Sequence, residues 1–181
     1  MVDGEKNLIE LAIRGEASAF GSLYDHYQPK IYRFVLVKVG RREEAEDLTH
    51  QVFLSAWTNI GRYEDLGFPF GSWLYRIARN AVVEFYRGRR NDVSLEKTDP
   101  EQFVMQASVH ADLAGKMDFE KVKSAIGELK PEYQDVILMR FVEDMPVKEV
   151  AAAMEKSEGA VKVIQHRAIK QLQNILGVRE S

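Results

Sequence analysis

Apolar residues recur at helical spacing through the first part of the chain. Between positions 20 and 35 they stand three or four residues apart, as on one buried face of an α-helix. This face contains Phe20, Leu23, Tyr24, Tyr27, Ile31, Phe34 and Val35. Pro29 falls within the segment and predicts a kink or a restart, because proline lacks the N–H of an interior helical turn. No alternating run is long enough to predict a sheet, so the pattern favours an all-α fold.

Two further helices are predicted before residue 91, separated by a loop. Residues 42–59 are charged at their start and then apolar at Leu48, Val52 and Ala56. The segment GRYEDLGFPFGS at 61–72 contains three glycines and a proline, which is typical of a loop. A long helix then begins at Ser72 or its neighbour and continues to about Arg87.

The C-terminal part predicts four helices, at 118–129, 131–143, 146–154 and 158–176. Pro131 and Pro146 fall at first-turn positions, where the missing N–H costs nothing. The short polar turn EKSEG joins the last two helices, an arrangement typical of a helix-turn-helix. Periodicity fades between 91 and 116, apart from a possible short helix near 101–112. We therefore predict two small helical domains, 1–91 and 118–181, joined by a flexible linker at 92–117.

Charge is distributed in blocks along a chain whose net charge is -3. Residues 76–90 contain five arginines against one acid, and residues 160–172 contain Lys162, Arg167 and Lys170 with no acid. Residues 91–128 carry eight acids against four lysines. This order of a basic block, an acidic connector and a second basic block predicts two modules that each contact a polyanion.

On a helical wheel, the basic residues of each block gather on one face of the helix. In the helix after residue 72, one face contains Arg76, Arg79, Asn80, Val83, Arg87 and Arg90. The opposite face contains Leu74, Ile77, Ala78, Ala81 and Phe85, and Trp73 lies at the border. Arg62, Tyr63, Phe68 and Phe70 precede this helix, and such interleaving of aromatic and basic residues suits unstacked bases. We expect Phe70 itself to be buried.

The last helix divides in the same way. Its apolar arc contains Val161, Ile164, Ala168, Leu172 and Ile175, and its other arc contains Lys162, Val163, His166, Arg167 and Lys170. Such donors can read guanine edges and phosphates in the major groove, and an exposed valine suits a thymine methyl group. A solvated basic face and a surface histidine are the simpler interpretations of these residues.

The sequence offers little for catalysis, metal binding or membrane insertion. There are no cysteines, the four histidines are scattered, and no Gly-rich phosphate loop is present. The acidic run Glu43, Glu44, Glu46 and Asp47 is more consistent with the first turn of a helix than with a metal site. We therefore expect no enzyme, no metal and no cofactor. No apolar run is long enough to span a membrane and no secretion signal is evident, so a cytoplasmic location is expected.

Three segments, EDLTHQVFLSAWTNI, FGSWLYRIARNAVVEFYRGRR and ELKPEYQDVILMRFVEDMPVKEVAAAMEKSEGAVKVIQHRAIKQL, carry a family resemblance. In their order they resemble bacterial RNA polymerase sigma factors of the extracytoplasmic-function group, which keep only regions two and four. The resemblance covers about residues 15–91 and 118–176, and WLYRIARN is its most specific part.

The resemblance implies a sigma factor that binds core RNA polymerase and directs promoter opening and transcription initiation at a restricted promoter set. Region two would dock on the clamp coiled coil of the largest subunit through Asp47, Leu48 and Gln51. The same region would open the minus-ten element and capture non-template bases through Arg62, Trp73, Arg76, Arg79 and Asn80. Region four would hold the beta-subunit flap and place Lys162, Val163, His166 and Arg167 on the minus-thirty-five element. A separate anti-sigma factor is a further expected partner.

Two departures from the family pattern fall in the helix-turn-helix. Glu155 stands where the family often has glycine, and Val163, Ile164 and Gln165 stand where it often has small and basic residues. Two other hypotheses remain open from the residues alone. One is a helix-turn-helix regulator that binds duplex DNA by itself, and the other is a helical nuclease that uses the acidic run.

Overall fold

The described part of the chain is built from helices and loops. The computed structural model describes residues 4–65, 67–93 and 121–177, and no strand occurs within these ranges. The chain divides into two compact units, whose described residues are 4–93 and 121–177. The predicted all-α fold class is therefore confirmed. The predicted linker beyond residue 93 and the short helix near 101–112 lie outside the described residues.

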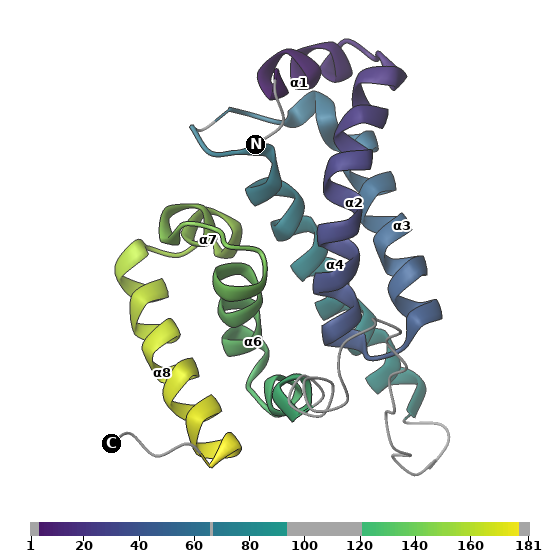
Figure 1. The fold of residues 1–181 in the computed structure, drawn as a ribbon. Coiled ribbons are helices and arrows are strands. Elements are labelled where there is room, and N and C mark those ends of the chain that lie inside the picture. Colours follow the sequence, from purple (N-terminus) through teal and green to yellow (C-terminus); the bar gives the residue numbers. More distant parts are fainter. Residues whose placement is uncertain (1–3, 66, 94–120, 178–181) are drawn as a thin grey trace, which may run out of the picture. The chain divides into compact units, whose positions relative to one another are not determined.

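The first unit packs three long helices side by side (Figure 1). These are α2 (Ala17–Val39), α3 (Arg42–Asn59) and α4 (Phe70–Val93), and the short α1 (Glu5–Ile13) lies across one end. A 3-10 turn, η1 (Ile60–Arg62), follows α3. The largest fully buried side chains of this unit are Leu23, Ile31, Phe34, Val35, Val39, Val52, Phe70 and Leu74. Burial of these apolar groups is the main force that holds the three helices together.

Helix α2 continues through Pro29, where the sequence predicted a kink or a restart. Pro29 lies on the exposed side of the helix, next to the partly buried side chains of Gln28 and Lys30. A carbonyl that loses its helical donor on this side can bind water instead, which lowers the cost of an interior proline. The buried face of α2, which includes Tyr27 and Ile31, crosses the proline without interruption.

Helix α4 begins at Phe70, two residues before Ser72, and extends beyond Arg87 to Val93. Its buried face also differs in part from the predicted one. Leu74 and Ala78 are buried as expected, but so are Tyr75 and Val82, whereas Ile77 and Ala81 are half-buried. Helix α4 contacts both α2 and α3. Its buried face is therefore rotated about the helix axis relative to the face that the apolar residues alone predict.

The second unit begins with a helical segment at 121–127, followed by α6 (Pro131–Ile137). Helix α6 runs into a π-helical turn, η2 (Leu138–Val142), and then come α7 (Val147–Met154) and α8 (Glu158–Leu176). Pro131 occupies the first turn of α6 as predicted, whereas Pro146 is the residue before α7. Val136, Leu138, Met139, Val150 and Val161 form the centre of the core. None of the helices within the described ranges has the length and apolarity needed to cross a membrane.

Helices α7 and α8 form the predicted helix-turn-helix. Glu155 caps the end of α7 in the left-handed conformation, with φ 54° and ψ 43°, and Ser157 caps the start of α8. The Ser157 hydroxyl accepts a hydrogen bond from the Ala160 N–H at 3.1 Å, which satisfies one of the free donors at the start of α8. The turn therefore forms with a glutamate in a conformation that favours glycine.

Candidate polymerase and nucleic-acid interfaces

One face of α3 carries an exposed row of side chains, which we call the α3 stripe: Asp47, His50, Gln51 and Leu54. Spacings of three and four residues place these side chains in line along the helix. Leu54 is 58% exposed, the largest exposed fraction among the large apolar side chains of the described residues. Leu48, by contrast, is buried and packs beneath the stripe. Of the three predicted polymerase contacts, Asp47 and Gln51 are therefore the accessible ones.

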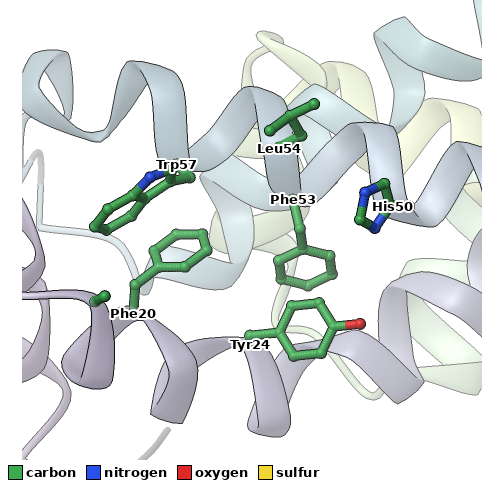
Figure 2. Close-up of a pocket in the computed structure, with 7 residues that line it drawn as sticks. Phe20, Tyr24, His50, Phe53, Leu54 and Trp57 are labelled. Carbon is green, nitrogen blue, oxygen red and sulfur yellow. The ribbon is translucent and has the colours of Figure 1, made fainter.

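Two grooves flank the α3 stripe. The groove toward α2 has a volume of about 280 Å³ and is almost entirely apolar; it is lined by Ala17, Phe20, Tyr24, His50, Phe53, Leu54 and Trp57 (Figure 2). Two aromatic pairs form its walls, with ring centroids 4.9 Å apart for Phe20 and Trp57 and 4.7 Å apart for Tyr24 and Phe53. The sequence pattern did not predict this groove. Leu54 was the available signal, because it lies seven residues after Asp47 and therefore on the same face of the helix.

The groove toward α4 is acidic. It is lined by Glu44, Asp47, Leu48, Gln51, Ala81, Glu84 and Phe85. Glu44 forms ion pairs with Arg41 at 3.3 Å and Arg89 at 3.0 Å, and Glu84 forms one with Arg87 at 2.8 Å. Asp47 has no ion-pair partner within the described part of the chain. Its carboxylate is thus available at the edge of this groove to a basic partner.

An aromatic cluster lies at the start of α4. The ring centroids of Tyr63, Phe70 and Trp73 are 5.2–5.4 Å from one another. Phe70 is fully buried as expected, whereas Tyr63, Trp73 and Phe68 are half-buried. Burial, with smaller contributions from Asp65 and Glu5, raises the pKa of the Tyr63 phenol to about 12, so this phenol is neutral at physiological pH. Trp73 is therefore partly accessible to solvent while it packs against the other two rings of this cluster. Arg62 is exposed at the end of η1.

The polar face of α4 continues from Trp73. Asn80 is exposed, and Arg76 and Arg79 are half-buried, with Val83 at 52% exposure further along the same face. Arg76, Arg79, Asn80 and Val83 therefore follow Trp73 along one side of the helix, as the wheel predicts.

Arg89, in the same basic block, connects two helices of the first unit. It pairs with Glu44 on α3 and its guanidinium lies 5.0 Å from the centre of the Phe85 ring, so it joins α4 to α3. The side chain of Arg90, predicted on the DNA face, lies outside the described residues.

In the second unit, α8 divides as predicted. Val161, Ile164 and Ala168 are buried, while the predicted contacts Lys162, Val163, His166 and Arg167 are all exposed. Val163 is 49% exposed although it is a β-branched apolar residue. The exposed arc of α8 therefore combines cationic groups, a histidine and one aliphatic group on a single rigid helix. Such a combination suits base edges in the major groove.

Two residues of the acidic run at the start of α3 form ion pairs. Glu44 pairs with Arg41 and Arg89, and Glu46 accepts a hydrogen bond from Arg42 at 2.7 Å. Within residues 4–65, 67–93 and 121–177, no cluster of three or more histidine, aspartate or glutamate side chains could hold a metal ion. The nuclease hypothesis therefore has no metal site in the described part of the chain.

Comparison with protein families matches both units. The model for sigma-70 region 2 matches residues 23–91, and the model for sigma-70 region 4 matches residues 119–172. Together these matches cover most of the chain. The protein belongs to the sigma-70 family of RNA polymerase sigma factors. Members of this family direct transcription initiation and are not enzymes.

Relatives of the chain identify it as one of the extracytoplasmic-function (ECF) sigma factors within this family. The ECF RNA polymerase sigma factor BldN of Streptomyces coelicolor is 36% identical over 179 residues, which are 93% of this chain and 64% of BldN. The present chain thus spans about two thirds of the length of BldN. SigW of Bacillus subtilis, also an ECF sigma factor, is 28% identical over 94% of this chain and 96% of its own.

A solved structure shares the fold of this sigma factor. The sigma factor RpoE of Bartonella quintana, solved in complex with the anti-sigma factor NepR, superposes with a TM-score of 0.72 at 23% identity. The superposition covers 89% of this chain and 98% of the RpoE chain. The α3 stripe and the polar face of α4 fall within the segment matched by region 2, and the exposed arc of α8 falls within the segment matched by region 4.

Proposed function

We propose that this ECF sigma factor docks on the clamp coiled coil of the largest polymerase subunit through the α3 stripe. Asp47 supplies an unpaired carboxylate and Gln51 an amide on the side of the acidic groove. His50 and Leu54 border the apolar groove on the other side. A partner helix with basic and apolar residues could contact both grooves at once. Its basic residues would pair with Asp47 at the acidic groove, and its apolar residues would be buried in the apolar groove. Leu48 then acts from beneath, as the packing support of the stripe.

We further propose that the start of α4 opens the minus-ten element. A flipped base can stack on the accessible edge of Trp73, and Arg76, Arg79 and Asn80 can bind phosphates and base edges along the adjoining face. Arg62 is exposed near the same aromatic cluster and can contact the phosphate backbone. The half-buried state of both arginines supports this role, because a held guanidinium loses less freedom on binding than an extended one.

In the second unit, α8 is proposed to enter the major groove of the minus-thirty-five element. Lys162 and Arg167 would contact phosphates or guanine edges, Val163 a thymine methyl group, and His166 either a base or a phosphate. This unit is also proposed to hold the beta-subunit flap. The two units act as domains 1–91 and 118–181, and the acidic segment at 92–117 is proposed to join them through the polymerase cleft.

A separate anti-sigma factor is the third proposed partner. RpoE of B. quintana was solved with the anti-sigma factor NepR, and the present chain shares its fold. The exposed apolar side chains of this chain, such as Leu54 and Phe141, are surfaces that an inhibitor could cover. Occupation of such surfaces would keep the protein from core polymerase.

The observation that carries the proposal is the presence of both sigma modules on one chain, each with its predicted binding face exposed. The decisive experiment is in vitro transcription from genomic fragments with core polymerase, with permanganate detection of unpaired thymines. We expect start-proximal opening only when both this protein and core polymerase are present. The Arg76→Ala, Arg79→Ala double variant should form holoenzyme yet open the promoter poorly. Tight, sequence-specific binding by the free protein would instead favour a regulator that acts alone.

A further inference from the structure

A carboxylate from the first helix is buried at the start of the proposed strand-opening helix. Glu5 of α1 is only 5% exposed. Its Oε1 accepts a hydrogen bond from the Phe70 backbone N–H at 2.9 Å, and its Oε2 accepts one from the Tyr27 hydroxyl at 2.8 Å. These bonds join α1, α2 and α4 at one point.

The position of this carboxylate on α4 is electrostatically favourable. Phe70 is the first residue of α4, and its N–H has no partner within the helix. The residue before it is Pro69, whose side chain has no oxygen that could cap the helix. Glu5 therefore supplies from 65 residues away the acceptor that a serine or aspartate usually supplies locally. The negative charge also faces the positive end of the α4 dipole.

The groups around this carboxylate leave little freedom of movement. The Phe70 ring contacts Trp73, Tyr63 and Tyr27, with centroids 5.2, 5.4 and 5.9 Å away. A Cβ atom at Gly71 would approach Tyr27 Cε1 to 2.8 Å, so α4 and α2 are in direct contact here. A shift of the Phe70 backbone would consequently displace Trp73 along with the rest of the aromatic cluster.

The neighbouring residue of α1 holds the other part of the same loop. Lys6 Nζ lies 3.4 Å from Asp65 Oδ2, and Asp65 Oδ1 accepts a hydrogen bond from the Gly67 N–H at 2.9 Å. Lys6 is largely exposed, so this ion pair is weak compared with the buried bonds of Glu5. Two consecutive residues of α1 thus hold this region: Glu5 contacts the first residue of α4, and Lys6 contacts the segment before α4.

We propose that Glu5 is a positioning residue for promoter opening. It fixes the first turn of α4, and through Phe70 it fixes the orientation in which Trp73 meets an unpaired base. The inference rests on the proposed role of α4 in strand opening. It assigns to α1 the role of holding the first turn of α4 in place. Glu5 itself does not contact DNA.

The first test reads the position of Trp73 in the free protein. The chain contains two tryptophans, so a Trp57→Phe background leaves Trp73 as the only one. In this background we expect Glu5→Ala to increase acrylamide quenching of Trp73 by about twofold. The Phe70 N–H would lose its buried acceptor, and the first turn of α4 would become more mobile. Glu5→Gln keeps an oxygen acceptor for the Phe70 N–H and should restore most of the protection. Glu10→Ala, an identical change at an exposed position of the same helix, should have no effect.

The second test uses holoenzyme with Trp57 intact. On a duplex promoter, Glu5→Ala should reduce permanganate-reactive complexes about tenfold, since a misplaced Trp73 captures the first base poorly. On the same promoter with a preformed bubble, whose thymines react without protein, transcript yield is the readout, and its reduction should be within about twofold because the cost of unpairing has already been met. Titration of core polymerase should give the wild-type affinity. If Glu5→Ala proves too unstable, Tyr27→Phe removes one bond to Glu5 and should show the same pattern more weakly.

Several outcomes would overturn the inference. Unchanged quenching of Trp73 would do so, as would wild-type opening of the duplex promoter by Glu5→Ala. An equal loss on both templates together with weaker holoenzyme formation would reduce Glu5 to a residue that only maintains the fold. If wild-type holoenzyme opens no promoter, the proposed function fails, whereas the quenching of Trp73 still decides whether Glu5 positions it.

Discussion

Arg140 and Gln165 join the π-helical turn of the second unit to α8, the helix proposed to contact DNA. Arg140 Nε donates a hydrogen bond to Gln165 Oε1 at 3.0 Å, and Nη1 of the same guanidinium donates to the Met145 carbonyl in front of α7. Gln165 lies on α8 next to His166, among the proposed base contacts. One side chain thus connects α8 to η2 and to the segment before α7.

This relationship predicts an energetic coupling between the two residues. Arg140→Ala and Gln165→Ala should each lower the stability of α8, and a double-mutant cycle should give a coupling of about 0.5–1.5 kcal/mol. Both tryptophans lie in the first unit, so fluorescence does not report on this region. Native-state hydrogen exchange of residues 158–176 in the full chain is the suitable measurement. Simple additivity of the two effects would mean that the bond does not stabilise α8.

The α3 stripe predicts a charge-dependent loss of polymerase binding. Asp47→Lys with Gln51→Ala should weaken holoenzyme formation by about 2–4 kcal/mol, because the reversed charge would repel a basic partner. Binding titration with core polymerase measures this change. Glu10→Lys alters net charge at an exposed site on α1 and serves as the matched control. A double variant that binds like this control would exclude Asp47 and Gln51 from the interface.

Leu54 predicts an apolar contribution to the same interface. Its side chain is 58% exposed, so Leu54→Ala should leave thermal unfolding of the free protein nearly unchanged. The same change should weaken core binding by about 1–2 kcal/mol if the side chain is buried in the complex. Ile13→Ala removes another exposed aliphatic group, on α1, and should not affect binding. Equal affinities for all three proteins would place the interface elsewhere.

The exposed arc of α8 predicts a separate loss of upstream recognition. Lys162→Ala and Arg167→Ala should each cost about 1–3 kcal/mol in binding to promoters with an intact minus-thirty-five element, with core affinity unchanged. Removal of a residue that contacts a phosphate should also reduce the salt dependence of binding by about one unit of slope. Footprinting at several salt concentrations measures both effects. Lys121→Ala, at an exposed lysine on another helix, provides the comparison.

Glu155 predicts a stabilising substitution. Its φ of 54° is costly for a residue with a Cβ and natural for glycine, so Glu155→Gly should stabilise the second unit by up to about 1 kcal/mol. Glu155→Ala keeps the backbone cost and removes the charge, so it should give no such gain. Hydrogen exchange of α7 and α8 distinguishes the two variants. A larger gain with alanine than with glycine would trace the effect to charge and not to the backbone.

The helices of this protein follow closely from local sequence. Spacing of apolar residues predicted α3 at 42–59 and α8 at 158–176, and both are found at those bounds. The exposed positions of Lys162, Val163, His166 and Arg167 follow from the same periodicity. In a helix with one clearly apolar arc, the buried face determines which side chains remain for a partner.

Other features depended on contacts between distant residues. Glu5 looks like an ordinary first-turn acid, yet it is buried because Phe70, 65 residues later, brings a free N–H to it. Arg89 was expected in a basic block, but Glu44 pairs with it across two helices. Tyr75 and Val82 are buried because α4 contacts α2 and α3 together. The sequence by itself determined where the helices lie and, for α8 with its single apolar arc, which face is exposed, since those depend on neighbours along the chain. Only the tertiary structure decided how each helix is capped and rotated and which charges are paired, since those depend on neighbours in space.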